Sequence, residues 1–440
     1  MESPKRPWFR SWFVLSIVVG CLSISVLQWA RSTGSLNEFI DRALPKPYDP
    51  DEDKDIEGFI TSRGFNFSRH EIITSDGYHI EFHRLWREDS VDRSSLPVVI
   101  GAHLLGTSNS YVMDPDGIAF AYAGADFDVW LVNNRGTRYG RKHKRLDPEK
   151  DHYDFYEFTI VEIGAIDLAE QIDYVLRETG HKKVNYVGVS QGGASLYALL
   201  SKKPAYNAKI AKASSYGGFR SFCYNNDIRY MVAALPYDIF GDYLFDLVST
   251  RQVLDVDFSS CSRTAKLCEY LGVNFLGFES NYYLNFSRVG VYGKNFPAGS
   301  SLRNFMWYAQ SRQIGCDGNM REFDHDYGLI PRLFTKLGLR ASKNLKIYGT
   351  AEPPLLDAKN VNIDLKIYYS DGDVLITSKE TFKVREDLNV PDGNLHRIPD
   401  WRFSHFNFVI RSRPHAIDEH SINYFRGIES PWNPESSEAA

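Results

Sequence analysis

The feature that most constrains the fold of this chain is a strand–turn–helix segment near its middle. The apolar run Val184–Val189 leads directly into a G-x-S-x-G turn at 188–192, and a helical run over 191–201 follows. Glycines beside a serine let the backbone turn sharply, which holds the serine in a strained conformation with its hydroxyl above the end of the strand. The segment therefore predicts a reactive serine, Ser190, at the edge of a sheet.

Patterns on both sides of this segment predict an α/β fold with a mostly parallel central sheet and helices on both faces. Three apolar runs typical of buried strands lie at 97–102, 127–133 and 365–370. Alternation of apolar and polar residues around Asp76-Gly77 predicts a β-hairpin. Thr159, with Glu162 three residues later, predicts the start of a helix that ends at Gly180.

The alternation breaks down between residues 217 and 322, where the chain is rich in Tyr, Phe and polar residues. This change predicts an insertion into the α/β core. We therefore expect four segments: a signal or membrane anchor with a linker at 1–48, the first part of the core at 49–216, the insertion at 217–322, and the second part of the core at 323–440.

The N-terminus has the pattern of an address for the secretory pathway. Residues 12–30 contain no charge, and three basic residues precede them, which is typical of a secretory signal. The run is also long enough to cross a bilayer. The alternatives are a cleaved signal and an uncleaved membrane anchor, with the rest of the chain lumenal or extracellular. Two N-x-S sequons, at Asn66 and Asn285, fit this location as N-glycosylation sites.

Charge and cysteine content argue against two classes of binding protein. The 440 residues include 51 Lys and Arg against 56 Asp and Glu, a net charge of −5, so no strong basic field exists to hold nucleic acid. The five cysteines form no C-x-x-C pair, which argues against a structural zinc site. An oxidising compartment would permit a Cys261–Cys268 disulfide. Aromatic residues make up 14% of the chain and suit either an ordinary core or a large apolar cavity.

A serine hydroxyl becomes a strong nucleophile only when a histidine takes its proton and a carboxylate orients that histidine. The strand pattern at 365–370 runs into Asp371 and Asp373, which are both candidates for the acid. Asp371 has the position of a turn residue, whereas Asp373 lies beyond the turn. His405, in the apolar context WRFSHFNF, is the candidate base. The N–H of Gln191, at the start of the helix, can point at a developing oxyanion.

At these residues the chain resembles the acid lipase family, which includes the gastric and lysosomal acid lipases and related steryl ester hydrolases. The resemblance extends from about residue 50 to residue 425. The segments that resemble motifs of that family lie at 72–78 (IITSDGY), 127–130 (FDVW), 133–136 (NNRG), 141–143 (RKH), 190–192 (SQG), 285–289 (NFSRV), 297–301 (PAGSS), 306–310 (MWYAQ) and 353–354 (PP). Asp373 and His405 then fall in the family's chain order.

The resemblance implies an α/β-hydrolase fold with a helical cap, here 217–322, over a catalytic triad of Ser190, Asp373 and His405. It implies that the N–H groups of Gln191 and Leu104 bind the oxyanion, and that the enzyme needs no cofactor and no metal. The implied substrates are esters of long-chain fatty acids, either triacylglycerols or steryl esters, met at a lipid interface. The family's cap disulfide lies near Cys261 and Cys268. The implied location is secreted, lysosomal or lumenal, or anchored to a membrane by an uncleaved N-terminal segment.

One departure from the family concerns the oxyanion loop. The family has H-G-L-L after its first core strand, whereas residues 101–105 are G-A-H-L-L, with no glycine after His103. If Leu104 had to adopt a positive φ, the loop would have to be rebuilt, and loss of one oxyanion donor lowers the rate by about 10²–10³. This departure keeps open a catalytically silent lipid-binding protein on a lipase fold. A short-chain carboxylesterase is the alternative among enzymes.

Overall fold

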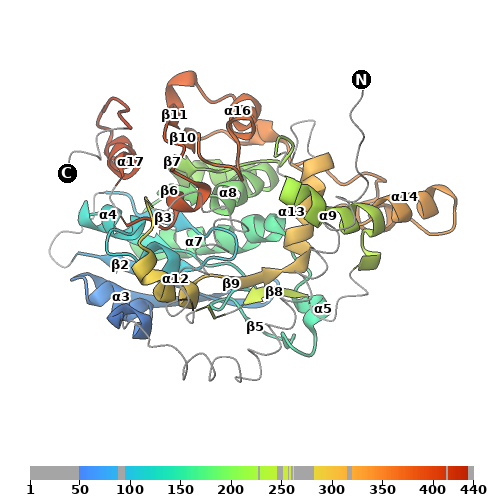
Figure 1. Cartoon of the computed structure of the whole chain (residues 1–440), viewed down its shortest axis with the longest axis horizontal. Coiled ribbons are helices and arrows are strands. Elements are labelled where there is room, and N and C mark those ends of the chain that lie inside the picture. Colours follow the sequence, from blue (N-terminus) through green and yellow to red (C-terminus); the bar gives the residue numbers. More distant parts are fainter. Residues whose placement is uncertain are drawn as a thin grey trace, which may run out of the picture.

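A mostly parallel β-sheet of nine strands forms the centre of the molecule (Figure 1). The structure, a computed structural model, describes residues 49–87, 95–225, 228–244, 251–255, 257–258, 261, 282–314, 320–412 and 415–434. The strand order is β1-β2-β4-β3-β6-β7-β10-β11, with β5 paired to β2. β2 is antiparallel to β1, β4 and β5, and the neighbouring pairs from β4 to β11 are parallel. The predicted fold class is confirmed.

The strands of the sheet are β1 (Asn66–Ile73), β2 (Tyr78–Trp86), β3 (Val98–Gly101), β4 (Val129–Leu131), β5 (Lys142–His143), β6 (Val184–Val189), β7 (Ile210–Tyr216), β10 (Asp364–Ser370) and β11 (Leu395–Ile398). Side chains alternate between the two faces, so Val98 and Ile100 pack on one side of β3 and Val99 on the other. The first face is covered by α3 (Ile56–Thr61), α4 (Ile118–Gly124) and α17 (Ala416–Arg426). The second is covered by α7 (Ala169–Thr179), α8 (Gln191–Lys202) and α16 (Ser378–Asp387).

The predicted hairpin and helix caps are confirmed. Ile73 of β1 pairs with His79 of β2 across the Asp76-Gly77 turn. Thr159 and Glu162 form the capping box that opens α6 (Ile160–Glu162). Gly180 ends α7 with a φ of 73°, a left-handed conformation that glycine adopts without steric cost. These features depend on residues a few positions apart, which is why the sequence alone predicted them.

A π-helical turn, Ile163–Leu168, separates α6 from α7, and the helical periodicity did not predict it. Asp167 lies in this turn and is fully buried. Its carboxylate accepts hydrogen bonds from the backbone N–H and the guanidinium of Arg135. Arg135 also binds the carboxylate of Asp76 at the hairpin turn. The π turn thereby joins the hairpin to the helix that packs beside α8.

The chain between β7 and β10 adds no strand to the central sheet among its described residues. It forms α9 (Ile228–Phe240), β8 (Gln252–Asp255), α12 (Val289–Asn295), β9 (Ala298–Ser301), α13 (Leu302–Ile314), α14 (Leu329–Lys336) and α15 (Lys343–Tyr348). β8 and β9 pair antiparallel as a separate small sheet. Figure 1 shows α9, α13 and α14 at one end of the molecule and α17 at the other. The boundary at residue 322 stays a prediction, and α14 and α15 follow it before the chain returns to the sheet.

Candidate active site

Ser190 occupies the predicted turn between β6 and α8 in a backbone conformation that L-residues rarely adopt. Its φ is 53° and its ψ is −118°. The flanking glycines make the turn sterically feasible. A Cβ on Gly188 would lie 2.6 Å from Cα of Gly193, and a Cβ on Gly192 would lie 2.5 Å from the carbonyl oxygen of Gly101. A side chain at either glycine would therefore force the turn apart.

A chain of hydrogen bonds joins Ser190 to side chains from two distant segments. His405 Nε2 lies 2.8 Å from Ser190 Oγ, and His405 Nδ1 lies 2.7 Å from Asp373 Oδ2. The other carboxylate oxygen of Asp373 accepts the N–H groups of Leu375 at 2.9 Å and Ile376 at 2.7 Å. Exposure of the three residues is only 8%, 7% and 4% for Ser190, His405 and Asp373. The structure thus brings together the three residues named from the sequence.

The second candidate acid, Asp371, lies outside this arrangement. Its carboxylate binds the guanidinium of Arg397 through Nε at 3.0 Å and through Nη2 at 2.6 Å, in an exposed ion pair. Asp373 follows two residues later, beyond the turn at Gly372, and reaches His405 instead. Geometry therefore separates the two carboxyl groups that the strand pattern offered as candidates.

The N–H groups of Gln191 and Leu104 make no hydrogen bond within the described part of the chain, so both remain available to a bound oxygen. The side chain of Gln191 is held from the insertion. Its Oε1 accepts a 2.9 Å hydrogen bond from Nδ2 of Asn304 and a second hydrogen bond from the hydroxyl of Tyr308. Asn304 and Tyr308 are four residues apart on α13, which places them on one face of that helix. This contact was missed from the sequence, although Tyr308 lies in one of the motifs.

The loop after β3 resolves the question raised by the missing glycine. Leu105, not Leu104, has a positive φ, 61°, and its carbonyl accepts the N–H of Ala298 at 2.8 Å. The ring of His103 packs against Gly106, where a Cβ would lie 2.1 Å from its Nε2. Burial lowers the pKa of His103 to about 3, so this imidazole is neutral. The strain of the loop therefore falls one residue after the predicted oxyanion donor.

Aromatic side chains form a wall beside Gln191. Phe219, Phe222 and Tyr308 lie with ring centroids 4.6 to 5.5 Å apart. Because Tyr308 also binds Gln191, this cluster borders the turn that carries Ser190. These rings belong to the core cluster that packs against α8, so part of the high aromatic content of the chain lies close to the candidate nucleophile.

Glu380 of α16, which was not singled out from the sequence, binds the start of the insertion through hydrogen bonds. Its carboxylate accepts the N–H of Tyr224 and the hydroxyl of Ser221 at 3.3 Å. Burial raises the pKa of this carboxyl to about 7. Charge on Glu380 is therefore coupled to the contact between the core and the first residues of the insertion.

The remaining predicted sites have different outcomes. Cys261 is disulfide-bonded, and so is Cys223, for which the sequence predicted no disulfide. Cys268 lies outside the described residues, so the Cys261–Cys268 pairing stays a prediction. Asn285 is exposed and Asn66 opens β1, and glycosylation of both stays a prediction. The N-terminal segment 1–48 also lies outside the described residues. Among the residues that the structure describes, no helix is long and apolar enough to cross a membrane.

Two family descriptions match the sequence around this site. Residues 104–266 match the family described as alpha/beta hydrolase fold, and residues 56–115 match the family described as partial alpha/beta-hydrolase lipase region. The first match contains the Ser190 turn, and the second contains the hairpin and the loop after β3. The matched regions therefore include the candidate nucleophile and both candidate oxyanion donors.

Similar proteins align over most of the chain. The mouse lipase member M is 30% identical over 290 residues, which cover 63% of this chain and 67% of that protein. The human lysosomal acid lipase/cholesteryl ester hydrolase is 28% identical over 432 residues, 95% of both chains. The bovine gastric triacylglycerol lipase is 28% identical over 336 residues, 74% of this chain and 80% of that lipase. The alignment with the lysosomal lipase thus reaches well beyond the matched motifs and into the second part of the core.

Proposed function

Since the chain belongs to the acid lipase family of α/β-hydrolases, whose activity is ester hydrolysis, we propose that it is a serine lipase acting on esters of long-chain fatty acids. The observation that carries this proposal is the hydrogen-bond chain from Ser190 through His405 to Asp373. The order serine, acid, histidine along the chain is that of α/β-hydrolases. A buried carboxylate on Nδ1 leaves Nε2 free to accept the serine proton.

In the proposed reaction, Ser190 Oγ attacks the ester carbonyl carbon while His405 Nε2 accepts the hydroxyl proton. The N–H groups of Gln191 and Leu104 bind the resulting oxyanion, and Asp373 stays ionised and stabilises the imidazolium. The ester C–O bond then breaks, and His405 returns its proton to the departing alcohol oxygen. A water molecule gives a proton to His405 and attacks the acyl-enzyme. The bond between the acyl carbon and Ser190 Oγ then breaks, and His405 returns the proton to Oγ, which releases the fatty acid and restores Ser190.

The proposed substrates are triacylglycerols or steryl esters at a lipid interface, with no cofactor and no metal. The aromatic wall of Phe219, Phe222 and Tyr308 supports an apolar acyl chain beside Ser190. The names of the gastric and lysosomal relatives support the same class of substrate and a location in the secretory pathway, extracellular space or lysosome. The fate of the N-terminal segment, whether cleaved or retained as an anchor, is part of this proposal.

The test is hydrolysis of a fluorogenic ester series of increasing acyl length by the wild-type chain and by Ser190→Ala. We expect activity on long-chain esters that the mutation abolishes while the thermal unfolding midpoint is kept. Activity that falls steeply with acyl length would instead identify a short-chain carboxylesterase. A folded wild-type chain without activity on any ester would sink the enzymatic proposal and favour a lipid-binding protein.

A further inference from the structure

Helices α14 and α15 and the loop between them form a hairpin, residues 329–348, whose outer surface is apolar. Its exposed large apolar side chains are Leu329, Leu333, Phe334, Leu337, Leu339, Leu345 and Ile347. Leu337 is 60% exposed and Leu339 70%. The spacing of four between Leu329, Leu333 and Leu337 places all three on one face of the helix. A helix of a soluble protein normally turns such a face toward the core, so an outward apolar face marks a binding surface.

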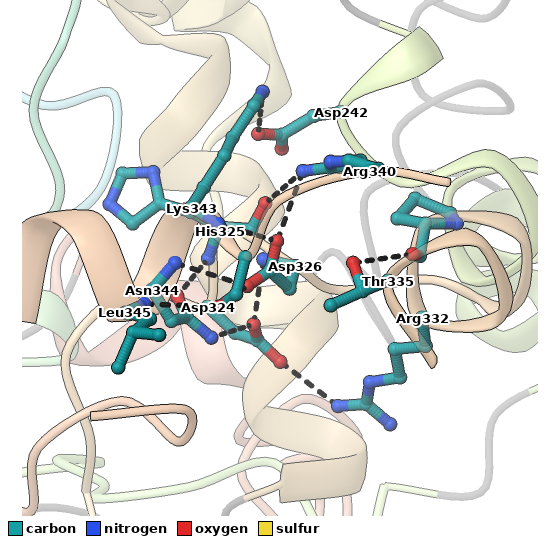
Figure 2. A network of polar contacts seen from close by, with 12 residues as sticks. Asp242, Asp324, His325, Asp326, Arg332, Thr335, Arg340, Lys343, Asn344 and Leu345 are labelled. Carbon is teal, nitrogen blue, oxygen red and sulfur yellow. Dashed lines mark hydrogen bonds and ion pairs between the residues drawn. The ribbon is translucent and has the colours of Figure 1, made fainter. Parts of the chain in front are cut away.

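A buried polar network beneath the hairpin explains why this face points outward (Figure 2). The carboxylate of Asp326 accepts hydrogen bonds from the hydroxyl of Ser342 at 2.6 Å and from the backbone N–H of Asn344 at 3.0 Å. The carboxylate of Asp324 accepts hydrogen bonds from Nδ2 of Asn344 at 2.7 Å and from the guanidinium of Arg332 at 2.9 Å. Asn344 is 1% exposed. Turning the leucines inward would bury them against these charged and amide groups and break the network.

The charge of the hairpin is as one-sided as its apolar face. Residues 328–351 contain five Lys and Arg and no Asp or Glu, in a chain with a net charge of −5. Three of these cations pair with the carboxylates of Asp242, Asp324 and Asp326, which are themselves buried. Lys336 and Lys346 are exposed and have no ionic partner in the part of the chain that the structure describes. The surface therefore presents leucines beside free ammonium groups.

We propose that residues 329–347 dock the protein on a lipid–water surface that carries anionic head groups. The exposed leucines enter the boundary of the acyl chains, and Lys336 and Lys346 bind the head groups, a combination typical of interfacial helices. This inference extends the proposed function, because a lipase must reach water-insoluble esters at such a surface. Docking itself requires no catalysis, so the two proposals fail separately.

The deciding experiment measures contact with acyl chains in the full-length protein carrying Ser190→Ala, which removes the proposed hydrolysis of the vesicles. Leu339→Trp is compared with Ile428→Trp, an aliphatic residue that is 52% exposed just after α17, at the other end of the molecule. The vesicles are phosphatidylcholine and phosphatidylglycerol with bromine on the acyl chains. We expect bromine to quench the tryptophan added at position 339 and not the one at position 428. Equal quenching of both would overturn the proposal.

Affinity for the same vesicles, measured by sedimentation, gives the second readout. The double variant Leu337→Asp with Leu339→Asp is expected to bind at least about tenfold more weakly. Lys336→Glu with Lys346→Glu is expected to lose roughly tenfold at low salt and little at high salt, because salt screens head-group attraction. Ile428→Asp is the matched control and keeps wild-type affinity. Normal binding by the leucine variants would overturn lipid docking. If these variants instead dissociate a dimer of the wild-type chain, the surface serves self-association.

Discussion

The side-chain amide of Asn304, on α13, donates a 2.9 Å hydrogen bond to Oε1 of Gln191, the residue that follows Ser190. Tyr308, one turn later on the same helix, donates to the same oxygen. Gln191 begins α8, and its N–H is one of the two candidate oxyanion donors. A helix of the insertion therefore fixes the side chain of a residue whose backbone takes part in the proposed chemistry.

We expect Asn304→Ala to lower kcat by about tenfold with little change in KM, because a displaced oxyanion donor weakens only the transition state. Steady-state kinetics on a soluble ester measure this. Tyr308→Phe removes the second donor to the same oxygen and should act in the same direction. A change in KM alone would contradict a positioning role for α13.

The pair Asp371 and Asp373 provides a matched test of the acid. Asp373→Asn removes the charge that orients His405 and should lower kcat by about 10⁴. Asp371→Asn breaks only an exposed ion pair with Arg397, whose effect on activity should stay within about twofold. Measuring kcat for both variants decides between the two carboxyl groups, and equal losses would refute the assignment of Asp373.

Ser190→Gly should be more stable than Ser190→Ala by about 1 kcal/mol in free energy of unfolding. The φ of 53° at this position strains any residue with a Cβ, and glycine removes the strain. Urea denaturation measures the difference, and both variants should be inactive. Asn389, exposed and with a φ of 50°, is the control, since glycine there should stabilise relative to alanine without loss of activity.

Glu380 should make stability fall as pH rises. Burial raises its pKa from an ordinary value of 4.5 to about 7 in the folded state. The folded protein therefore holds the proton of this carboxyl more tightly than the unfolded chain does. The resulting stabilisation is complete at pH values below the pKa of the unfolded state and is lost as the pH rises through about 7. Glu380→Gln should therefore gain about 1–3 kcal/mol over the wild type at pH 8 relative to pH 5. Glu386→Gln, an exposed change on the same helix, should not reproduce this difference.

Peptide mapping of the unreduced protein should find Cys261 joined to Cys268. Cys261 is disulfide-bonded in the structure, and a loop of this length between the two cysteines is easily closed. Mass spectrometry of a proteolytic digest with and without reduction identifies the linked peptides. A peptide that joins Cys261 to Cys223 would falsify the pairing expected from the sequence.

The parts of this structure that could be predicted from the sequence are those determined by residues close together in the chain. The Ser190 turn, the hairpin at Asp76-Gly77 and the capping box at Thr159 are each encoded within a few residues, so their physics is readable in the sequence. The π turn around Asp167 was not predicted because its carboxylate binds Arg135, a residue 32 positions away whose proximity depends on the tertiary fold.

The same distinction applies to the candidate site. The turn pattern left both Asp371 and Asp373 as candidate acids, and their contacts with Arg397 and His405 in the structure separate them. The missing glycine pointed to backbone strain at Leu104, whereas the positive φ lies at Leu105. The contact of Asn304 with Gln191 spans 113 residues and left no local signal beyond helical spacing.

The hydrogen-bonded groups of the site come from segments far apart in the chain: 215 residues separate Ser190 from His405. The whole insertion lies between them, so no fragment made early in synthesis contains both groups. A nascent chain that lacks the His405 segment therefore lacks the hydrogen-bond chain on which the proposed hydrolysis depends. Conversely, turnover by a purified sample would report that the segments carrying Ser190, Asp373 and His405 have come together, which would make the proposed hydrolysis a folding assay for this part of the molecule.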